Sequence, residues 1–286
     1  MSKVVGFVLK RSMPEALDAL ALAQSLSPEC RFLLEKEGHH ALPNPPQGIE
    51  AVDHETFVKE VDLVVVLGGD GTLIHAASLL QERVVPILGV NLGTVGFLAE
   101  FPLDDFKETF PKALAGEFKH VDRMRLDVEV SRNGDVVLGR RILNDAVVAQ
   151  LAMARIAQFK VHFGGRLVTS LRGDGLIVST PTGSTAYNLA AGGPILTPGL
   201  EAIAVTPICP HAVTQRPLVL KPGEVLEISL ESDNTVFVTL DGQYGHEFVR
   251  GDKMKVQRAP ITTRLLSYPG RSYFRTLRTK LGWGES

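Results

Sequence analysis

Apolar runs and amphipathic stretches alternate along the N-terminal part of the chain. Short apolar runs predict strands at Val4–Leu9, Arg31–Leu34, Asp62–Leu67 and Val84–Val90. Between them, apolar side chains at helical spacing predict helices at Pro14–Leu26, near Thr56–Glu60 and at about Thr72–Gln81. The run 62–67 is apolar almost throughout, as in a strand buried on both faces of a parallel sheet. The alternation predicts a doubly wound α/β domain.

Near residue 120 the spacing of the apolar residues changes to strict alternation. Met124, Leu126, Val128 and Val130 alternate with polar residues, which is typical of a half-exposed antiparallel strand, and Asn133-Gly134 indicates a hairpin turn. Further strands are predicted over 157–163, 176–179, 225–230, 235–240 and 254–257. We therefore expect an α/β domain over 1–118 and a β-rich domain over 119–265. The pattern leaves open whether the second is a sandwich or an irregular set of stacked sheets.

The C-terminal stretch RSYFRTLRTKLGW (271–283) is basic and predicts a short helix. Such a helix can be a solvated face or a docking element. We expect 266–286 to pack back on the N-terminal domain.

Composition places the chain among well-buried globular proteins. Of its 286 residues 44% are hydrophobic, and the net charge of −2 gives no general attraction to nucleic acid or anionic membrane. Two cysteines, Cys30 and Cys209, are too few for a disulfide framework and fit a reducing compartment. No run approaches the roughly 18 apolar residues that span a bilayer. We expect a cytoplasmic protein with neither nucleic acid nor membrane as a partner.

The stretch VVVLGGDGT (64–72) leads from an apolar strand through a glycine-rich turn into a helix. Such a turn directs backbone N–H groups at an anion, although it is neither a GxxxxGK[ST] loop nor a GxGxxG fingerprint. Asp70 would repel phosphate unless Mg²⁺ lies between them or the carboxylate takes a proton from an attacking hydroxyl, and both belong to phosphoryl transfer. The alternative is a tight turn with Asp70 as helix N-cap. His75 could reach the phosphates or be an ordinary surface histidine.

Two further stretches follow strands or interrupt apolar runs. NLGTVGF (91–97) puts a second two-glycine turn at the end of the next strand, so the two turns point to one crevice, unless both are ordinary βα loops. In RILNDAVV (141–148), Asn144 and Asp145 are polar groups inside an apolar run and need partners. A ribose diol is one candidate partner, and a β-bulge or hairpin corner is the alternative reading.

The most specific stretch is PTGSTAY (181–187), followed by GGPI (192–195) and preceded by Arg172 and Asp174. Its hydroxyls gather around a helix start and offer donors to a polar, ring-bearing ligand. The pattern is not GxSxG, so a serine hydrolase is excluded. In TLDGQYG (239–245), Asp241-Gly242 favours a hairpin turn, from which Gln243 could still reach a ligand. Cys209 and His211 lack a second pair to complete a zinc site, so no metal site is predicted.

Taken together, these stretches resemble the NAD kinase family. GGDGT, NLGTVGF, NDAVV, PTGSTAY, GGPI and DGQ look like that family's landmarks, in its order, from residue 68 to residue 243. The resemblance implies transfer of the γ-phosphoryl group of ATP, or of polyphosphate, to the 2′-hydroxyl of the adenosine ribose of NAD, giving NADP. It implies Mg²⁺ or Mn²⁺ with the ATP, no tightly bound prosthetic group, an active site between the two domains, and a homodimer or homotetramer.

The same resemblance implies roles for individual residues. Asp70 matches the family's proposed proton acceptor and, with Gly71, also a dinucleotide contact. The phosphate contacts of the nucleotide match Gly68, Gly69, Gly71 and Thr72, and His75, one turn along, is expected to reach the phosphates from the same helix. Asn144 and Asp145 match the ribose-binding pair. The remaining dinucleotide contacts match Arg155, Arg172, Asp174, Thr182, Thr185, Ala186, Tyr187, Asn188, Leu189, Ala190 and Gln243.

Two positions depart from the family pattern: Asp145 stands where many members have Glu, and His75 where many have Arg. Two other functions fit parts of the sequence. A GGDG-type kinase for a lipid or sugar would need an apolar acceptor pocket or an arginine cluster in place of PTGSTAY. A dinucleotide-binding regulator without turnover would gain nothing from a carboxylate beside phosphates.

Overall fold

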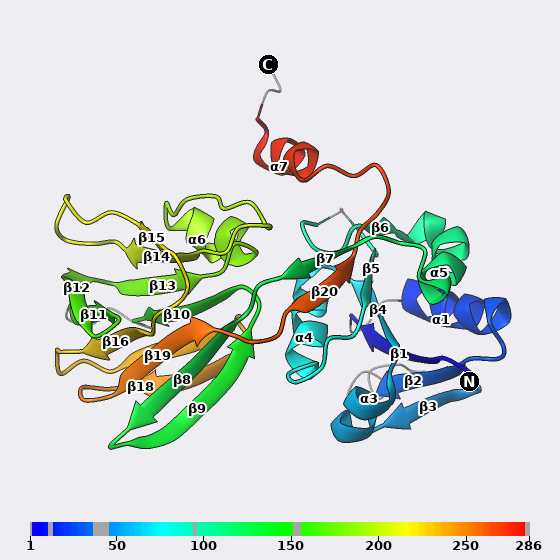
Figure 1. Cartoon of the computed structure of the whole chain (residues 1–286), viewed down its shortest axis with the longest axis horizontal. Helices are drawn as coiled ribbons and strands as arrows, with labels where there is room; N and C mark the ends of the chain where they lie inside the picture. The colour runs from blue at the N-terminus through cyan, green and yellow to red at the C-terminus, as the bar shows by residue number, and fades with distance from the viewer. Residues whose placement is uncertain (1, 11–13, 37–45, 94–95, 151–155, 284–286) are drawn as a thin grey trace. The chain divides into compact units, whose positions relative to one another are not determined.

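The computed structural model describes residues 2–10, 14–36, 46–93, 96–150 and 156–283 (Figure 1). The chain divides into two compact units. Unit 1 contains residues 1–122 and 263–286, and unit 2 contains residues 123–262. The described helices include none that is long and apolar enough to cross a bilayer.

Unit 1 is built on a largely parallel sheet with the strand order β3-β2-β1-β4-β5-β20-β7, and the short β6 pairs with β5. The strands are β1 Val4–Leu9, β2 Arg31–Glu35, β3 Ile49–Val52, β4 Leu63–Gly68, β5 Ile87–Asn91, β6 Phe101–Pro102, β7 His120–Arg123 and β20 Thr263–Leu266. The helices are α1 Glu15–Leu26, α3 His54–Glu60, α4 Asp70–Leu79, η1 Leu103–Asp105, α5 Phe106–Ala115 and α7 Tyr273–Leu281. The predicted doubly wound α/β fold is confirmed.

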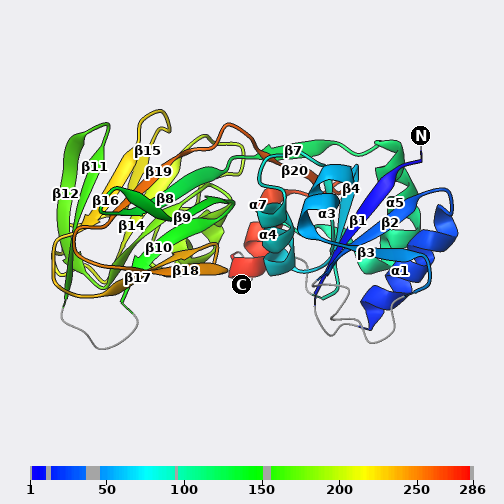
Figure 2. The ribbon, with the colours of Figure 1, turned by 90° about the horizontal axis from the view of Figure 1, so that it is seen from below.

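The central strands lie between the helices α1 and α5 on one side and α3 and α4 on the other (Figure 2). Phe7, Val65 and Val90 belong to the core cluster that contains residues of α1 and α5. On the other face, a Cβ on Gly6 would lie 2.5 Å from the Phe57 ring of α3, and one on Gly89 would lie 2.8 Å from Leu73 of α4. The central strands are therefore covered on both sides, which explains why β4 is apolar throughout.

Unit 2 is a sandwich of two six-stranded sheets, so the structure decides between the two arrangements that the sequence left open. Their strand orders are β15-β14-β13-β10-β17-β18 and β12-β11-β16-β19-β8-β9, and one apolar core contains residues of both. Its elements are β8 Leu126–Arg132, β9 Asp135–Ile142, β10 Asp145–Ala149, β11 Ala157–Phe163, β12 Arg166–Gly173, β13 Gly175–Ser179, η2 Gly183–Thr185, α6 Tyr187–Ala190, β14 Ile203–Ile208, β15 Leu218–Leu220, β16 Leu226–Leu230, β17 Val236–Leu240, β18 Tyr244–Phe248 and β19 Lys253–Arg258.

Two predicted element starts in unit 1 were wrong, and strand β3 was not predicted. The strand predicted from Val84 begins at Ile87, directly after Pro86, which has no N–H to give a sheet. Helix α4 begins at Asp70, two residues before the predicted start, because its first turn contains Gly71 and so does not look helical in sequence. Strand β3 was not predicted because it lies at the sheet edge with Glu50 and Ala51 exposed.

Candidate active site

Asp70 lies at the junction of β4 and α4. Gly69 occupies the N-cap position without a side-chain cap, and Asp70 is the first helical residue, so the alternative of Asp70 as N-cap is wrong. Its carboxylate instead accepts three backbone N–H bonds from the turn after β5. Phe97 donates to Oδ2 at 2.8 Å, and Leu98 and Ala99 both donate to Oδ1 at 3.0 Å. The turn fixes the position and orientation of the carboxylate.

The two glycine-rich turns of unit 1, which follow neighbouring strands, are thus joined by hydrogen bonds. Leu92 N–H also donates to the Gly68 carbonyl at 3.2 Å. The close approach of the turn after β5 to Asp70 requires glycine at position 96, because a Cβ on Gly96 would lie 2.0 Å from Asp70 Oδ1. A Cβ on Gly69 or Gly71 would meet no atom within 4 Å, so the backbone on either side of Asp70 is open to a ligand.

The other predicted phosphate contacts lie along the same strand end and helix. Gly68 ends β4, and a Cβ there would lie 2.4 Å from Thr72 Oγ1, so the two residues are closely packed. Thr72 and His75 are half-buried residues of α4. The first turn of α4 supplies the N–H groups and the positive end of the helix dipole that favour an anion.

Unit 2 contains a second carboxylate that holds backbone in the same manner. Asp241, at the β17–β18 turn, accepts N–H bonds from Leu143 at 2.8 Å, Asn144 at 2.7 Å and Asp145 at 3.1 Å. Its backbone has φ +52°, a left-handed conformation that Asp adopts more readily than most residues. The sequence indicated only a hairpin turn here, because the residues that Asp241 binds lie almost a hundred positions earlier.

Asp145 is a buried carboxylate, and none of the described residues donates a side-chain hydrogen bond to it. Burial, followed by the negative charge of Asp241, raises the pKa of Asp145 to about 7. Burial also raises the pKa of Asp241, against the three amides and Arg125, which act in the opposite direction. A hydroxyl donor such as a ribose diol would supply the partner that Asp145 lacks among the described residues.

Asn144 is held beside Asp145 by the strand that precedes PTGSTAY. Thr180 N–H donates to the Asn144 carbonyl at 2.9 Å, and Thr180 Oγ1 donates to the Leu143 carbonyl at 2.6 Å. A Cβ on Gly183 would lie 2.3 Å from the Asn144 carbonyl oxygen. The Asn144 Oδ1 is buried, and no described residue donates to it. It is therefore an acceptor without a partner among the described residues.

The stretch 181–190, which begins with PTGSTAY, divides into residues that build the loop and residues that present an exposed surface. Ser184 and Asn188 are fully buried; Asn188 donates to the carbonyls of Ser184 at 3.1 Å and Pro194 at 3.0 Å, and its Oδ1 accepts from Thr206 at 2.6 Å. The exposed or half-buried residues of the segment are Thr185, Ala186, Tyr187, Leu189 and Ala190, whereas Thr182 is buried. Both the nitrogen and the oxygen of the Asn188 amide are thus hydrogen-bonded within the protein.

The remaining predicted dinucleotide contacts are surface residues. Arg172 and Asp174 are exposed at the end of β12, and Gln243 is exposed in the β17–β18 turn. Arg155 lies outside the described residues. Two residues that were not predicted as site residues also contact the site: Asp241, as described above, and Arg271, whose Nη2 donates to the Gly96 carbonyl at 3.1 Å.

The chain matches two family models, the ATP-NAD kinase N-terminal domain over residues 3–118 and the ATP-NAD kinase C-terminal domain over residues 143–267. It is 50% identical to the NAD kinase of Geobacter sulfurreducens over 239 residues, which cover 83% of this chain and 84% of that protein. It is 49% identical to the NAD kinase of Geotalea daltonii over 228 residues, 79% of this chain and 80% of that protein.

Two solved structures are similar to this one. Yeast NADH kinase complexed with NADH has a TM-score of 0.90 at 26% identity, with 100% of this chain and 89% of that chain covered. An NAD kinase from Archaeoglobus fulgidus in complex with ATP has a TM-score of 0.73 at 24% identity, over 99% of both chains, and supports the fold.

Proposed function

Since the chain belongs to the NAD kinase family and phosphorylates NAD, we propose that Asp70 accepts the proton of the attacking ribose 2′-hydroxyl. In this step the 2′-oxygen forms a bond to the γ-phosphorus of ATP. The bond between that phosphorus and the β,γ-bridging oxygen breaks, and ADP leaves. The hydroxyl proton passes to the Asp70 carboxylate, and the dinucleotide product is NADP.

The observation that carries this proposal is the way in which Asp70 is held. A carboxylate has about four acceptor positions, and the backbone N–H groups of 97–99 fill two on Oδ1 and one on Oδ2. Oδ2 is thus the oxygen with a position that the described residues leave open, and we assign the proton to it. The carboxylate is oriented before the substrate binds, so little reorganisation is needed in the transition state.

We assign the phosphates of the donor to the backbone around Asp70. Gly68, Gly69, Gly71 and Thr72 surround the start of α4, where N–H groups favour an anion, and the open space over Gly69 and Gly71 supports a close approach. His75 lies one turn further along the same helix. Mg²⁺ enters as part of the Mg–ATP substrate, where it neutralises charge on the phosphates.

We assign the dinucleotide to Asp70, Gly71 and residues of unit 2. Asn144 Oδ1 and the Asp145 carboxylate are acceptors suited to ribose hydroxyls. The assignment is completed by the exposed part of 185–190 and by Thr182, Arg155, Arg172, Asp174 and Gln243. Within it, Asn188 acts by holding the segment in shape, since its amide is bonded to the protein. The same proposal includes a homodimer or homotetramer in the cytoplasm.

The test is NADP formation by the purified protein, measured with an NADP-specific dehydrogenase. NAD and NADH are compared as acceptors, and ATP and polyphosphate as donors, with and without Mg²⁺. We expect product from NAD and Mg–ATP, and loss of that product in Asp70→Asn at NAD concentrations that saturate the variant in calorimetry. Full activity of Asp70→Asn would contradict the assignment of the proton acceptor.

A further inference from the structure

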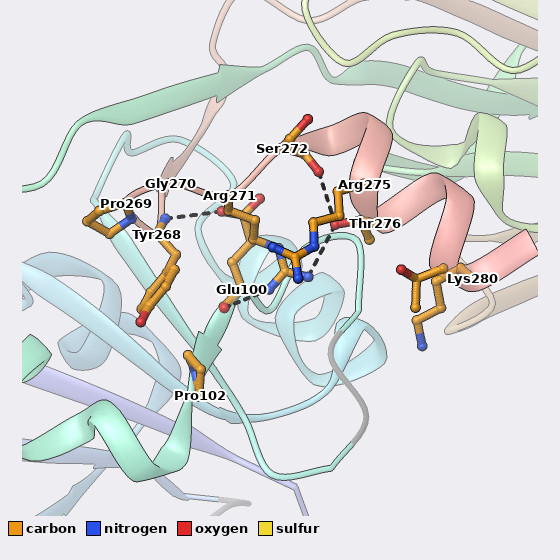
Figure 3. A pocket seen from close by; sticks show the side chains of 11 residues that line it. Glu100, Pro102, Tyr268, Pro269, Gly270, Arg271, Ser272, Arg275, Thr276 and Lys280 are labelled. Atoms are coloured by element: carbon orange, nitrogen blue, oxygen red, sulfur yellow. Dashed lines mark hydrogen bonds between the residues drawn. The ribbon is translucent and has the colours of Figure 1, made fainter. Parts of the chain in front are cut away.

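The C-terminal segment of unit 1 forms a pocket of about 460 Å³ beside the turn that holds Asp70. Its lining includes Glu100, Tyr268, Arg271, Arg275, Thr276 and Lys280 (Figure 3). We propose that Arg271 is a positioning residue for phosphoryl transfer, because its guanidinium fixes the turn whose amides hold Asp70. This inference rests on the proposed role of Asp70.

The guanidinium of Arg271 bridges the two ends of that turn. Its Nη1 donates to the Glu100 carbonyl at 2.8 Å, and its Nη2 donates to the Gly96 carbonyl at 3.1 Å. The residues between these two carbonyls are Phe97, Leu98 and Ala99, whose N–H groups bind the Asp70 carboxylate. Arg271 thus binds the carbonyl groups of the turn, and the N–H groups of the same turn bind the Asp70 carboxylate.

Arg271 is itself fixed by the segment around it. Its Nη2 also donates to Thr276 Oγ1 of α7 at 3.3 Å, and its backbone N–H donates to the Tyr268 carbonyl at 3.2 Å. Tyr268 N–H in turn donates to Glu100 Oε2 at 3.1 Å (Figure 3). The planar fork of a guanidinium suits two carbonyl acceptors, and a lysine ammonium cannot reproduce it.

The charge of Arg271 is close enough to act on the site electrostatically as well. Burial lowers the pKa of Arg271, and the negative charges of Glu100 and Asp70 act in the opposite direction. Asp70 is therefore among the charges that favour the protonated form of Arg271. Losing Arg271 would remove both the bridge between the two carbonyls and a positive charge near the carboxylate.

The experiment compares Arg271→Met with Arg275→Met. Arg275 is an exposed cation of the same pocket, and among the described residues its side chain has no hydrogen bond to the turn 96–100. We expect Arg271→Met to lower kcat about 10- to 100-fold, with KM for NAD and ATP within about threefold, because misplacement of the reacting group affects the chemical step. We expect Arg275→Met to stay within about twofold of the parent kcat.

Chemical rescue separates positioning from a loss of folding. Guanidinium added at millimolar concentration should restore kcat of Arg271→Ala saturably and should leave Arg275→Ala unchanged. If Arg271→Ala does not fold, Arg271→Lys replaces it, and we expect at least a threefold loss of kcat in that variant at an unchanged melting temperature. Absence of rescue from a folded variant, or a Lys variant with the parent kcat, would overturn the inference.

A double-mutant cycle with Asp70→Asn tests whether Arg271 acts through Asp70. We expect Arg271→Met to cost less than about threefold in kcat when Asp70 is already Asn. Multiplicative losses would show that Arg271 acts independently, and they would overturn the inference while leaving the role of Asp70 intact. Parent-like activity of the single variant Asp70→Asn would instead overturn the proposed function, and this inference with it.

Discussion

Two aspartates, one in each unit, hold a distant turn by the same three bonds. Asp70 accepts the N–H groups of 97–99, and Asp241 accepts those of 143–145, each with two bonds on Oδ1 and one on Oδ2. Their surroundings differ. Asp70 lies between two glycines open to a ligand, whereas the pKa of Asp241 is raised by burial, beside the second buried carboxylate Asp145.

We call this arrangement, in which three backbone N–H groups donate to one carboxylate, a three-amide clamp. The difference shows that such a clamp does not by itself define the role of its carboxylate. Where open backbone and a helix start adjoin the clamp, the carboxylate is a candidate reagent, and the clamp orients it. Where a second carboxylate and an unsatisfied Asn144 Oδ1 adjoin it, we propose that the clamp holds Asn144 and Asp145 in place for a ligand. We expect substitutions of Asp70 to lower the rate of reaction and substitutions of Asp241 to lower stability and NAD affinity.

The largest effect is expected for Asp70→Asn. The amide keeps the size of the side chain but cannot take a proton, so kcat should fall roughly 10²- to 10⁴-fold, the usual range for loss of a general base. Steady-state kinetics at saturating NAD and Mg–ATP measure it, with Asp104→Asn as a control at an unrelated acidic position of unit 1. A loss below threefold would contradict the role.

The next effect is expected for Asp241→Ala in unit 2. It would leave the N–H groups of 143–145 without their acceptor, which should lower the free energy of unfolding by about 2–4 kcal/mol. Urea unfolding measures this change, and the KM for NAD should rise in parallel because Asn144 and Asp145 lose their position. Parent-like stability would show that the clamp on 143–145 contributes nothing.

A smaller effect is expected for Gly96→Ala, which pushes a methyl group against Asp70. Since the Cβ would lie 2.0 Å from Oδ1, the carboxylate or the turn must move, and kcat should fall about 10- to 100-fold. Gly199→Ala is the matched control, because a Cβ there meets no atom within 4 Å. Equal kcat values for the two variants would argue against a precise position for Asp70.

The smallest effect is expected in the pH dependence of KM for NAD, which should follow the ionisation of Asp145. With its pKa at about 7, the carboxylate accepts ribose hydroxyl bonds better as it ionises, so KM for NAD should fall up to about tenfold between pH 6 and 8. Asp145→Asn should make KM flat over this range.

The same group affects stability with the opposite trend. A folded-state pKa above the unfolded value means that the unfolded chain binds fewer protons, so stability falls as pH rises from about 4 to about 7. Thermal unfolding from pH 5 to 8 should show this decline in the parent and a weaker one in Asp145→Asn. A rise in stability with pH would contradict the raised pKa.

The comparison also shows what local sequence can predict. Strand β4, helix α1 and the hairpin at Asn133-Gly134 were predicted because each depends on the periodicity or turn preference of adjacent residues. The place of GGDGT and NLGTVGF at neighbouring strand ends followed from the alternation of strands and helices. The sequence could therefore indicate that the two turns follow neighbouring strands.

The contacts that complete the candidate site were not predictable in this way. Asp70 reaches residues 27 to 29 positions away, and Asp241 reaches back across 96 to 98 positions. Arg271 contacts a carbonyl 175 positions before it. Such pairs depend on which strands become neighbours. One cue was present, since Asp241-Gly242 marks a turn in which the aspartate side chain is available to bind backbone.

The most direct test measures one turnover of NADP formation by Asp70→Asn and by Asp241→Asn at saturating NAD and Mg–ATP. We expect a chemical step slowed 10²- to 10⁴-fold in the first variant and within about threefold of the parent in the second. The opposite order, or equal rates in the two variants, would contradict the claim that one clamp orients a reagent and the other holds a binding surface.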